Sequence, residues 1–418
     1  MAARFVEVVE MSGHVIDSLL LPKVLDAIMS RGAGYEIQEF RVGKRQEDPS
    51  YARIEVQADS PDGLDRVLAE LHSHGAIPVH TSDCRVLVAD CAGAFPEGFY
   101  CSTNFRTEVR LNKEWIAVAD QEMDCGIAID AEGRAARCVP MASVVAGERI
   151  AIGHAGIRVF PIEGAGKKHE LFEFMTSAVS SEKPKAVSVR EIAHAMRRTR
   201  AAGEKILAVL GPAVVHTGGG AIVARLIREG FLHVLFAGNA LATHDIEQAF
   251  YGTSLGVSLE RGLPTSEGHE HHLRTINAIR RIGGIAKAVE SGRLSSGIMF
   301  ECVKHRVPFV LAGSIRDDGP LPEVITDSLV AQDAMRRLLP GVGFCLMVAT
   351  TLHSIAVGNL LPASVKVACI DISPATVTKL MDRGSTQTVG IVSDAEPFLQ
   401  SLMLELERPE SPRASALG

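Results

Sequence analysis

The chain has 418 residues, of which 46% are hydrophobic and 22% charged, values that exclude a disordered or fibrous protein. The net charge is −7 and no stretch is rich in lysine and arginine, so the sequence lacks the electrostatic signature of a nucleic-acid-binding protein. Acidic residues interrupt the first twenty residues, which argues against a signal peptide, and we expect a cytoplasmic protein.

The longest apolar stretch, residues 341–363, has the length of a membrane helix but not its composition. It contains His353, Asn359 and several hydroxyl-bearing residues, which are costly to bury in lipid. We therefore predict a buried strand followed by a helix, and no membrane partner. The eight cysteines include no Cys-x-x-Cys pair, and the histidines at 269–272 lack the H-E-x-x-H spacing, so we expect reduced thiols and no metal.

The first ninety residues alternate between strand and helix patterns in the order βαββαβ, which is typical of a ferredoxin-like module. We therefore predict such a module, of the ACT type, over residues 1–91. Modules of this kind bind amino acids or pair between subunits, and a packing role is an equal alternative. We expect a homo-oligomer that pairs through this module. The predicted strands cover residues 5–11, 35–43, 52–59 and 84–91, and the predicted helices cover 20–32 and 61–75.

The rest of the chain divides into three predicted parts. Residues 92–162 hold short β segments separated by glycine, asparagine and proline, which predicts a small antiparallel β-rich unit, and residues 163–187 look like a connection that carries one helix. Residues 188–418 alternate short apolar runs with helical patterns, which predicts a doubly wound, mostly parallel, Rossmann-like α/β sheet. Its predicted strands cover 205–210, 232–237, 308–313, 344–349, 365–370 and 387–392, and its predicted helices cover 221–230, 245–252, 272–283, 328–339 and 374–384.

Ligands of such a sheet bind beyond the carboxyl ends of the strands, and polar residues follow these strands directly. The first strand precedes GPAVVHTGGGA, whose glycines let backbone N–H groups approach an anion, although a tight turn explains them equally well. Asn239, His244 and Asp245 follow the second strand. Asn239 is a helix cap in the simplest interpretation. His244 and Asp245 would face different sides of a helix, so we expect only one of them at the site.

Acidic residues follow three later strands. The Arg-Asp-Asp cluster at 316–318 can hold ribose hydroxyls or a substrate ammonium, and its alternative is a solvated turn. Asp371 ends a predicted strand before a Ser-Pro helix start, which is the usual position of a ribose-hydroxyl acceptor in dinucleotide folds. A capping role for Asp371 is less favoured because Ser373 can cap the helix instead. Asp394 is either a cap or a cofactor contact.

Two further groups are candidates for chemistry. Glu301, Cys302 and Lys304 stand just ahead of a predicted strand. Cys302 is a candidate nucleophile, although no histidine partner is evident and most lone cysteines are packing residues. Asn104 and Arg106, from the β-rich unit, are candidate binders of a substrate carboxylate.

Long motifs along almost the whole chain resemble those of the archaeal-type ornithine cyclodeaminase family. The first ninety residues and residues 95–109 look like the region that this family shares with lysine-ketoglutarate reductase/saccharopine dehydrogenase proteins. The resemblance implies an NAD-dependent ammonia-lyase that converts the small-molecule substrate L-ornithine to L-proline and ammonia. The motifs that carry it are residues 211–230, 237–247, 268–280, 296–327, 349–363 and 371–394.

The resemblance also implies the residues that contact the cofactor. An acid at the end of the fifth strand favours NAD over NADP, because it repels a 2′-phosphate. The implied contacts are Asn239, Ala240, Asp318, Thr350, Thr351, Leu352, His353, Asp371, Asp394 and Ala395.

The implied reaction is redox-neutral. Hydride leaves the α-carbon of ornithine, the δ-amine closes the ring as ammonia departs, and the hydride returns. Such chemistry needs a cation for the substrate carboxylate, a carboxylate for an amine and a general base. The candidates are Arg316 or Arg106 for the cation, Asp317, Asp318 or Glu301 for the carboxylate, and His244, Lys304 or His353 for the base.

Two other functions remain open on the sequence. One is another NAD-linked dehydrogenase or lyase that acts on a diamino acid, with the same fold. The other is a non-catalytic regulator that binds NAD and an amino acid. The gathering of ionisable residues at strand ends disfavours the regulator, because a module without chemistry does not need them there.

Overall fold

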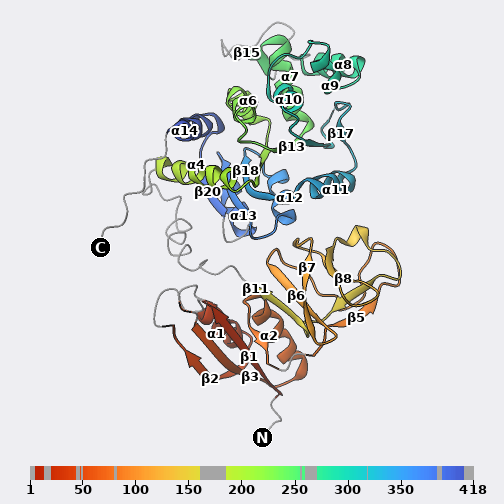
Figure 1. Cartoon of the computed structure of the whole chain (residues 1–418), viewed down its shortest axis with the longest axis vertical. Coiled ribbons are helices and arrows are strands. Elements are labelled where there is room, and N and C mark those ends of the chain that lie inside the picture. Colours follow the sequence, from red (N-terminus) through yellow and green to blue (C-terminus); the bar gives the residue numbers. More distant parts are fainter. Residues whose placement is uncertain are drawn as a thin grey trace, which may run out of the picture. The chain divides into compact units, whose positions relative to one another are not determined.

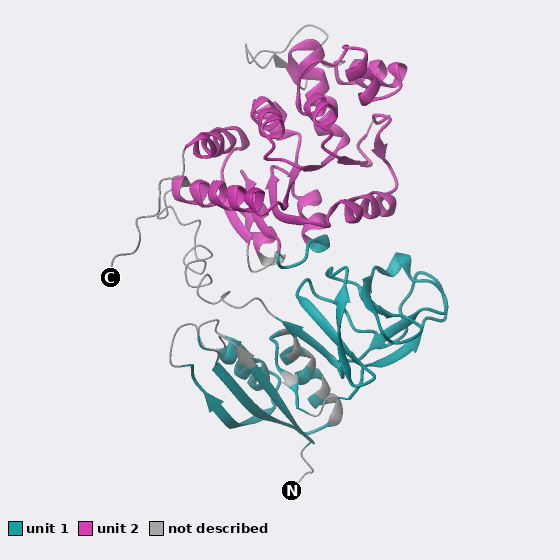
Figure 2. Ribbon diagram, viewed as in Figure 1, with its two compact units in different colours: residues 1–178, 359–364 teal, residues 179–358, 365–418 magenta. Residues whose placement is uncertain are grey.

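The computed structural model describes residues 5–13, 20–43, 48, 50–79, 82–160, 185–254, 257–258, 271–317, 319–383 and 388–408. The chain forms two compact units (Figure 2). Unit 1 comprises residues 1–178 and 359–364, and unit 2 comprises residues 179–358 and 365–418. Of the connection predicted at 163–187, only residues 185–187 are described, and they begin a helix of unit 2.

Unit 1 begins with a four-stranded antiparallel sheet in the order β2-β3-β1-β4, packed against two helices (Figure 1). The predicted βαββαβ order is confirmed. Burial alternates along β3, where Ala52, Ile54 and Val56 are buried beside Val24 and Ile28 of the first helix. The elements are β1 (Phe5–Gly13), α1 (Leu20–Ser30), β2 (Gly34–Arg41), β3 (Ser50–Ala58), α2 (Pro61–Ser73) and β4 (Ile77–Pro78).

The prediction was wrong about the last strand of the module. A strand does form within residues 84–91, as β5 (Arg85–Val88), but it pairs with β10 (Arg149–Ile152) in a second sheet of unit 1. The two-residue β4 takes its place beside β1, because Val9 and Glu10 of β1 pair with Ile77–Pro78. A strand this short leaves no recognisable pattern, whereas β5 lies in a clear apolar run, so the sequence favoured β5 as the strand beside β1.

The second sheet of unit 1 has seven strands in the order β11-β6-β7-β9-β8-β10-β5. It is larger than the small antiparallel unit that the sequence predicts, and the β7–β9 pair is parallel. Asn112 and Lys113 join β6 to β7 with positive φ angles of 52° and 69°, as a two-residue hairpin requires. The remaining strands are β6 (Arg106–Leu111), β7 (Glu114–Ala119), β8 (Gly126–Ile129), β9 (Ala136–Val139) and β11 (Ile157–Phe160), and a 3-10 turn covers Met141–Ser143.

Residues 359–364 complete unit 1 from far along the chain. The backbone N–H of Met123 donates to the carbonyl of Asn359 (3.1 Å), and the N–H of Ala363 donates to the carbonyl of Asn104 (2.8 Å). The Asn359 amide also donates to a carboxylate oxygen of Asp124 (3.3 Å). This six-residue segment therefore satisfies polar groups of the N-terminal unit.

Unit 2 is built on a seven-stranded sheet whose strand pairs are all parallel, in the order β17-β16-β13-β12-β18-β19-β20 (Figure 1). The predicted doubly wound sheet is confirmed, and β17 is an additional edge strand. Central strands are fully buried: Ile206 to Leu210 of β12 are each at most 1% exposed. The strands are β12 (Lys205–Leu210), β13 (Val234–Gly238), β16 (Phe309–Ala312), β17 (Val324–Ile325), β18 (Val342–Val348), β19 (Lys366–Asp371) and β20 (Thr388–Val392).

Four of the predicted helices of unit 2 form close to their predicted bounds, as α6, α8, α11 and α13, but the helix predicted from residue 245 begins at Asn239. The apolar stretch 341–363 forms β18 and then α12, as predicted, and among the described residues no helix is long and apolar enough to span a membrane. The helices are α4 (Lys185–Ala201), α5 (Ala213–His216), α6 (Gly220–Arg228), α7 (Asn239–Tyr251), α8 (His271–Ile282), α9 (Ile285–Glu290), α10 (Ile298–Lys304), α11 (Ser328–Leu338), α12 (Leu352–Leu360), α13 (Pro374–Arg383) and α14 (Ala395–Glu407), with short strands β14 (Thr253–Ser254) and β15 (Val257–Ser258).

Candidate active site

The order of the strands in unit 2 reverses between β12 and β18. After β12 the chain adds β13, β16 and β17 on one side, and it then returns to add β18, β19 and β20 on the other. A doubly wound sheet binds its ligand at this switch point, beyond the carboxyl ends of the strands. We call the edge where these ends meet the carboxyl edge, and the opposite one the amino edge.

The switch point is closed by backbone. Gly211 follows β12, and its N–H donates to the carbonyl of Val348 at 2.9 Å. A Cβ atom on Gly211 would lie 1.8 Å from the carbonyl oxygen of Ala349, so only glycine fits. Ala349 itself has a positive φ of 54°. The main chains that follow β12 and β18 are therefore packed directly against each other at the switch point.

His353 meets the loop after β13 at the same edge. Its Cε1 atom would lie 3.0 Å from a Cβ on Gly238, so the imidazole occupies the space that this glycine leaves. Burial lowers the pKa of His353, and the carboxylate of Asp317 acts in the opposite direction. Asp317 also accepts a hydrogen bond from the N–H of Ser314 (2.8 Å), which closes the turn after β16. Loops from three strands thus converge on a neutral imidazole.

Asn239 links the start of α7 to the segment after β16 by a hydrogen bond. It is the first residue of α7, whose N-cap is Gly238, so the predicted capping role falls to its neighbour. Its side-chain oxygen accepts hydrogen bonds from the N–H of Leu321 (3.0 Å) and from the hydroxyl of Thr243 (3.3 Å). Only 6% of Asn239 is exposed, and it holds the segment after β16 against α7.

Asp371 and Asp394 end the next two strands of the carboxyl edge. Asp371 is half-buried and accepts a hydrogen bond from the N–H of Ser373 (2.9 Å), while Ser373 accepts from the N–H of Thr376 and caps α13, as the sequence suggests. Asp394 is the N-cap of α14 and accepts from the N–H of Ala395 (2.6 Å). Because Ser373 caps α13, the carboxylate of Asp371 is not needed as the cap of that helix.

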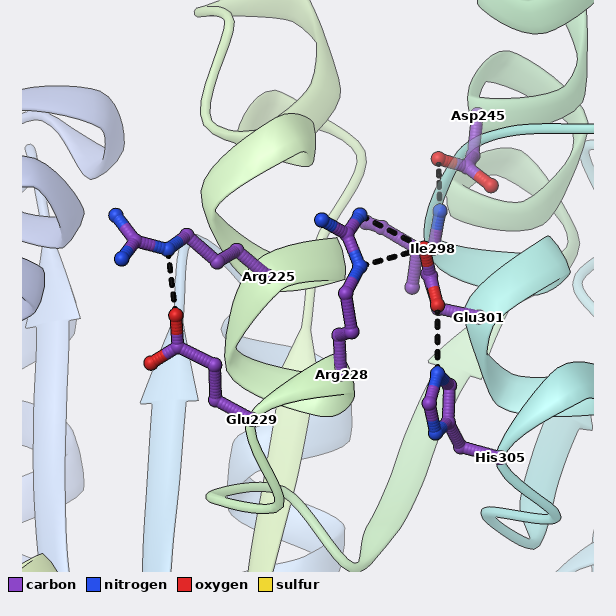
Figure 3. A network of polar contacts seen from close by, with 7 residues as sticks. All are labelled: Arg225, Arg228, Glu229, Asp245, Ile298, Glu301 and His305. Atoms are coloured by element: carbon purple, nitrogen blue, oxygen red, sulfur yellow. Dashed lines mark hydrogen bonds and ion pairs between the residues drawn. The ribbon is translucent and has the colours of Figure 1, made fainter.

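His244 and Asp245 point in different directions, as expected. The Asp245 carboxylate accepts from the N–H groups of Ile298 (2.7 Å) and Met299 (2.8 Å) at the start of α10 (Figure 3). Burial raises the pKa of Asp245 to about 6, although these two hydrogen bonds act to lower it. Asp245 thus fixes the start of α10, and a role of His244 at the site stays a prediction.

Glu301, Cys302 and Lys304 lie away from the carboxyl edge, so the structure does not bring these three catalytic candidates together with the other predicted site residues. They lie on α10, which ends five residues before β16 begins and therefore approaches the amino edge. Cys302 is fully buried in the core, and burial raises the pKa of its thiol, so no thiolate is available. Lys304 is exposed, with its ammonium 5.2 Å from the ring centre of Phe300.

Glu301 belongs to a structural ion-pair network at the amino edge (Figure 3). Its side chain is 4% exposed, and one oxygen accepts from the Arg228 guanidinium at 2.7 and 3.0 Å. The other oxygen lies 3.0 Å from Nε2 of His305. One Glu301 oxygen is therefore paired with the Arg228 guanidinium, and the other is buried within ion-pair distance of the His305 ring but accepts no hydrogen bond from the described residues.

The other predicted site residues have different surroundings. Asn104 is buried in unit 1, where Arg106 forms an ion pair with Glu108 at 2.5 Å. Arg158 shares that carboxylate and lies 4.1 Å from the ring centre of Trp115. Arg316 is exposed in the loop after β16. Asp318 lies outside the described residues.

The structure adds polar residues that sequence reasoning missed. His216, on α5, lies with its ring 4.7 Å from that of His244 in an edge-to-face arrangement. Burial, and secondarily His244, lower the pKa of His216 to about 4. Glu247 is completely buried, with one oxygen 2.8 Å from Nδ1 of His244. The i,i+3 spacing of His244 and Glu247 on one helix is the sequence signal that identifies this pair.

The parallel sheet, its switch point and the polar carboxyl edge define unit 2 as a Rossmann-type ligand-binding unit. Three family profiles match the chain in succession. "Arginine dihydrolase ArgZ-like, C-terminal, Rossmann fold" covers residues 190–402, "Arginine dihydrolase ArgZ-like, C-terminal, first region" covers 106–189, and "LOR/SDH bifunctional enzyme conserved region" covers 6–105.

The chain is 53% identical to the ornithine cyclodeaminase of Methanopyrus kandleri over 96% of this chain and 97% of that protein. It is 50% identical to the ornithine cyclodeaminase of Methanothermobacter thermautotrophicus over the same shares. The chain belongs to the ornithine cyclodeaminase family, as the resemblance implied, and it is an enzyme.

Solved structures agree with this placement. The apo structure of ArgZ, a cyanobacterial arginine dihydrolase, has a TM-score of 0.84 at 38% identity, and the match covers 97% of this chain but 59% of ArgZ. A LOR/SDH protein of Methanococcus maripaludis has a TM-score of 0.72 at 46% identity, covering 78% of this chain and 97% of that one. The complex of AgrE with ornithine and NAD⁺ has a TM-score of 0.53 at 41% identity, covering 97% and 58%.

Proposed function

We propose that the enzyme converts L-ornithine to L-proline and ammonia, with NAD as its cofactor. The observation that carries this proposal is the 46–53% identity to five archaeal ornithine cyclodeaminases over nearly their whole length. The complex of AgrE with ornithine and NAD⁺ supports the same pair of ligands. The arginine dihydrolase activity of ArgZ and AgrE is not part of the proposal, because this chain spans less than three-fifths of each.

The carboxyl edge fits a dinucleotide. Gly211 and Gly238 present main-chain groups without a Cβ atom at two strand ends, and Asp371 offers a carboxylate at the end of β19. Leu352, the first residue of α12, and Ile372, which directly follows Asp371, are 77% and 71% exposed and present apolar side chains after β18 and β19. An acid for ribose hydroxyls next to apolar contacts for a base is the arrangement that dinucleotide sites use. We propose Asn239, Ala240, Thr350–His353, Asp371, Asp394 and Ala395 as NAD contacts.

NAD would supply a reversible acceptor for the hydride of the ornithine α-carbon, so the cycle consumes no oxidant. The protein has to hold ornithine in the folded conformer that brings its δ-amine to the α-carbon, and such positioning contributes much of the acceleration of an intramolecular step. Arg316 and Asp317, which follow β16 at the carboxyl edge, are proposed to hold the carboxylate and an amine of the substrate. Asp318, Asn104 and Arg106 remain predictions for the same tasks.

The direct test is to incubate the purified protein with NAD⁺ and L-ornithine and to quantify proline, ammonia and NADH together. We expect equal amounts of proline and ammonia with no accumulation of NADH. NADH without proline would identify a dehydrogenase instead. Tight NAD binding without turnover, repeated with other diamino acids, would point to a regulator.

Substitution of Asp371 by alanine is expected to raise the dissociation constant of NAD by roughly 10- to 100-fold, because a hydrogen bond to a charged group contributes about 1.5–3 kcal/mol. The preference for NAD over NADP should narrow at the same time. Titration of the variant with both nucleotides measures the two effects. Asp333→Ala, which removes a surface carboxylate paired with Arg336 on α11, is the matched control. An unchanged NAD affinity in folded Asp371→Ala would remove this assignment.

A further inference from the structure

A continuous series of polar contacts joins α5, α7, β14 and the start of α8. His216 contacts His244 ring to ring, and its Nδ1 lies 2.6 Å from the Ser254 hydroxyl. Nδ1 of His244 lies 2.8 Å from one oxygen of Glu247, and the hydroxyl of Thr253 donates to the other oxygen (2.9 Å). Thr253 in turn contacts Nδ1 of His271 (2.8 Å). Three imidazoles and a carboxylate are thus ordered inside the protein.

The series reaches the carboxyl edge through α7. This helix begins directly after β13, and Ala240, His244 and Glu247 share one of its faces because they are four and three residues apart. At 1.5 Å per residue, His244 lies one turn, about 6 Å, beyond Ala240. His216 arrives at the same place from the neighbouring strand, since α5 follows β12. The His244 imidazole therefore borders the proposed cofactor and substrate site.

Glu247 fixes which nitrogen of His244 carries the proton. When Glu247 is ionised, its carboxylate only accepts hydrogen bonds, and Nδ1 of His244 then donates to it. In the neutral ring the other nitrogen, Nε2, then carries the free electron pair. The Glu247 side chain is 0% exposed and that of His244 is 10% exposed, so their geometry is held by packing. The result is an imidazole oriented by a carboxylate, with an acceptor nitrogen on its far side.

The surroundings of His244 tolerate a positive charge on its ring. Among the described residues, the titratable groups that face it are Glu247 from its own helix, His216 from α5 and, with ring centres 6.4 Å apart, His272 from α8. The low pKa of His216 keeps that neighbour neutral at pH 7, so it does not repel a protonated His244. The Glu247 carboxylate lies close enough to stabilise the imidazolium.

We propose that His244 is the general base of the ornithine reaction and that Glu247 is its positioning residue. This assignment rests on the proposed function. An N–H bond of the α-ammonium breaks and its proton moves to Nε2 of His244, while the electron pair stays on nitrogen and forms the C=N bond as the α-hydrogen leaves as hydride to the nicotinamide. After the δ-ammonium has lost its proton to water, the δ-amine bonds to the α-carbon and the C=N pair returns to the α-nitrogen. His244 gives its proton back to that nitrogen while the ring nitrogen loses a proton to water. The bond from the α-carbon to the α-nitrogen then breaks, ammonia leaves, the electron pair of the ring nitrogen forms the ring C=N bond, and the hydride returns to the α-carbon.

The chain offers a matched control. Glu301 of α10 and His305, the C-cap residue of that helix, form a second carboxylate–imidazole pair, with 3.0 Å between Oε2 and Nε2, but this pair lies towards the amino edge (Figure 3). A substitution there tests whether loss of a carboxylate–imidazole pair elsewhere in unit 2 lowers activity. The informative variants are therefore His244→Asn, Glu247→Gln and, as control, His305→Asn.

Steady-state kinetics of proline formation is the first measurement. We expect kcat to fall at least about 100-fold in His244→Asn, as loss of a general base does, and about 10- to 1,000-fold in Glu247→Gln. The KM for ornithine and the dissociation constant of NAD should stay within about threefold, because the base acts in the transition state. His305→Asn should keep the wild-type kcat. Folded His244→Asn that retains more than a tenth of the wild-type kcat would overturn the proposal.

The second measurement does not depend on turnover. In protein labelled with ¹⁵N-histidine, NMR should show His244 as the Nδ1–H tautomer, and Glu247→Gln should abolish that preference. A wild-type His244 in the Nε2–H tautomer would also overturn the proposal, even if His244→Asn fails to fold. Activity of the wild-type protein distinguishes failure of the proposed function from failure of the His244 assignment. If it makes no proline the proposed function fails, whereas active wild type with active His244→Asn removes the base alone.

Discussion

Alanine in place of Gly211 is expected to lower the free energy of unfolding by about 3 kcal/mol or more, at the upper end of what overpacking costs. The added Cβ would lie 1.8 Å from the carbonyl oxygen and 2.7 Å from the carbonyl carbon of Ala349. Both are main-chain atoms that cannot rotate away, so β12 and β18 have to separate and the hydrogen bond from Gly211 to Val348 is lost. Denaturant unfolding measures the loss, and NAD titration should show that binding weakens with it.

Gly358→Ala is the control for this substitution. Gly358 lies within α12, and nothing stands within 4 Å of the Cβ that would be added. Alanine is favoured over glycine in a helix by up to about 1 kcal/mol, so this variant should be as stable as the wild type or slightly more. Equal stability of Gly211→Ala and the wild type would show that the two strand ends are not held in contact.

Replacing Arg228 by methionine is expected to destabilise the protein by about 2–4 kcal/mol, slightly less than the 3–5 kcal/mol of a fully buried pair, because half of the arginine is exposed. The variant leaves the carboxylate of Glu301, 4% exposed, without its guanidinium partner. The double variant Arg228→Met/Glu301→Leu removes both charges and should recover most of the loss. Equilibrium unfolding of the two variants measures the difference.

The same network provides a functional contrast. Because Glu301 lies on the helix that ends towards the amino edge, Glu301→Gln should leave kcat for proline formation close to that of the wild type. A large fall in kcat at unchanged stability would restore Glu301 as a catalytic carboxylate. If Arg228→Met alone is as stable as the wild type, His305 by itself is enough to stabilise the buried Glu301 carboxylate.

The fold of unit 2 could be predicted because all strands of its parallel sheet except β17 are apolar runs of four or more residues, separated by helical patterns. The exceptions have physical causes. β17 has two residues and pairs only at the sheet edge, so it leaves no pattern. Helix α4 went unrecognised because arginines surround its apolar stripe, although Val189, Ile192, Ala193 and Met196 stand at helical spacing and are buried.

The site could be predicted only in part. The rule that ligands bind at carboxyl ends of strands identified Asp371, Asn239 and His353 as residues of one edge. The same rule excludes Glu301, Cys302 and Lys304, because a residue just ahead of a strand belongs to the opposite edge. Pairing between side chains from different loops could not be predicted at all. The contact of His216 with His244 depends on how α5 and α7 pack, and no spacing in the sequence encodes it.

The segment 359–364 has a consequence for how the chain is made. Unit 1 is otherwise contained in the first 178 residues, yet its hydrogen bonds to Asn104, Met123 and Asp124 wait for residues more than 180 positions later. At about 5–20 residues per second, a ribosome needs roughly 10–40 s to bridge that gap. During this interval unit 1 lacks residues 359–364 and the hydrogen bonds that they make. Its assembly can finish only after most of the second sheet has emerged, which ties the folding of the two units into a single order.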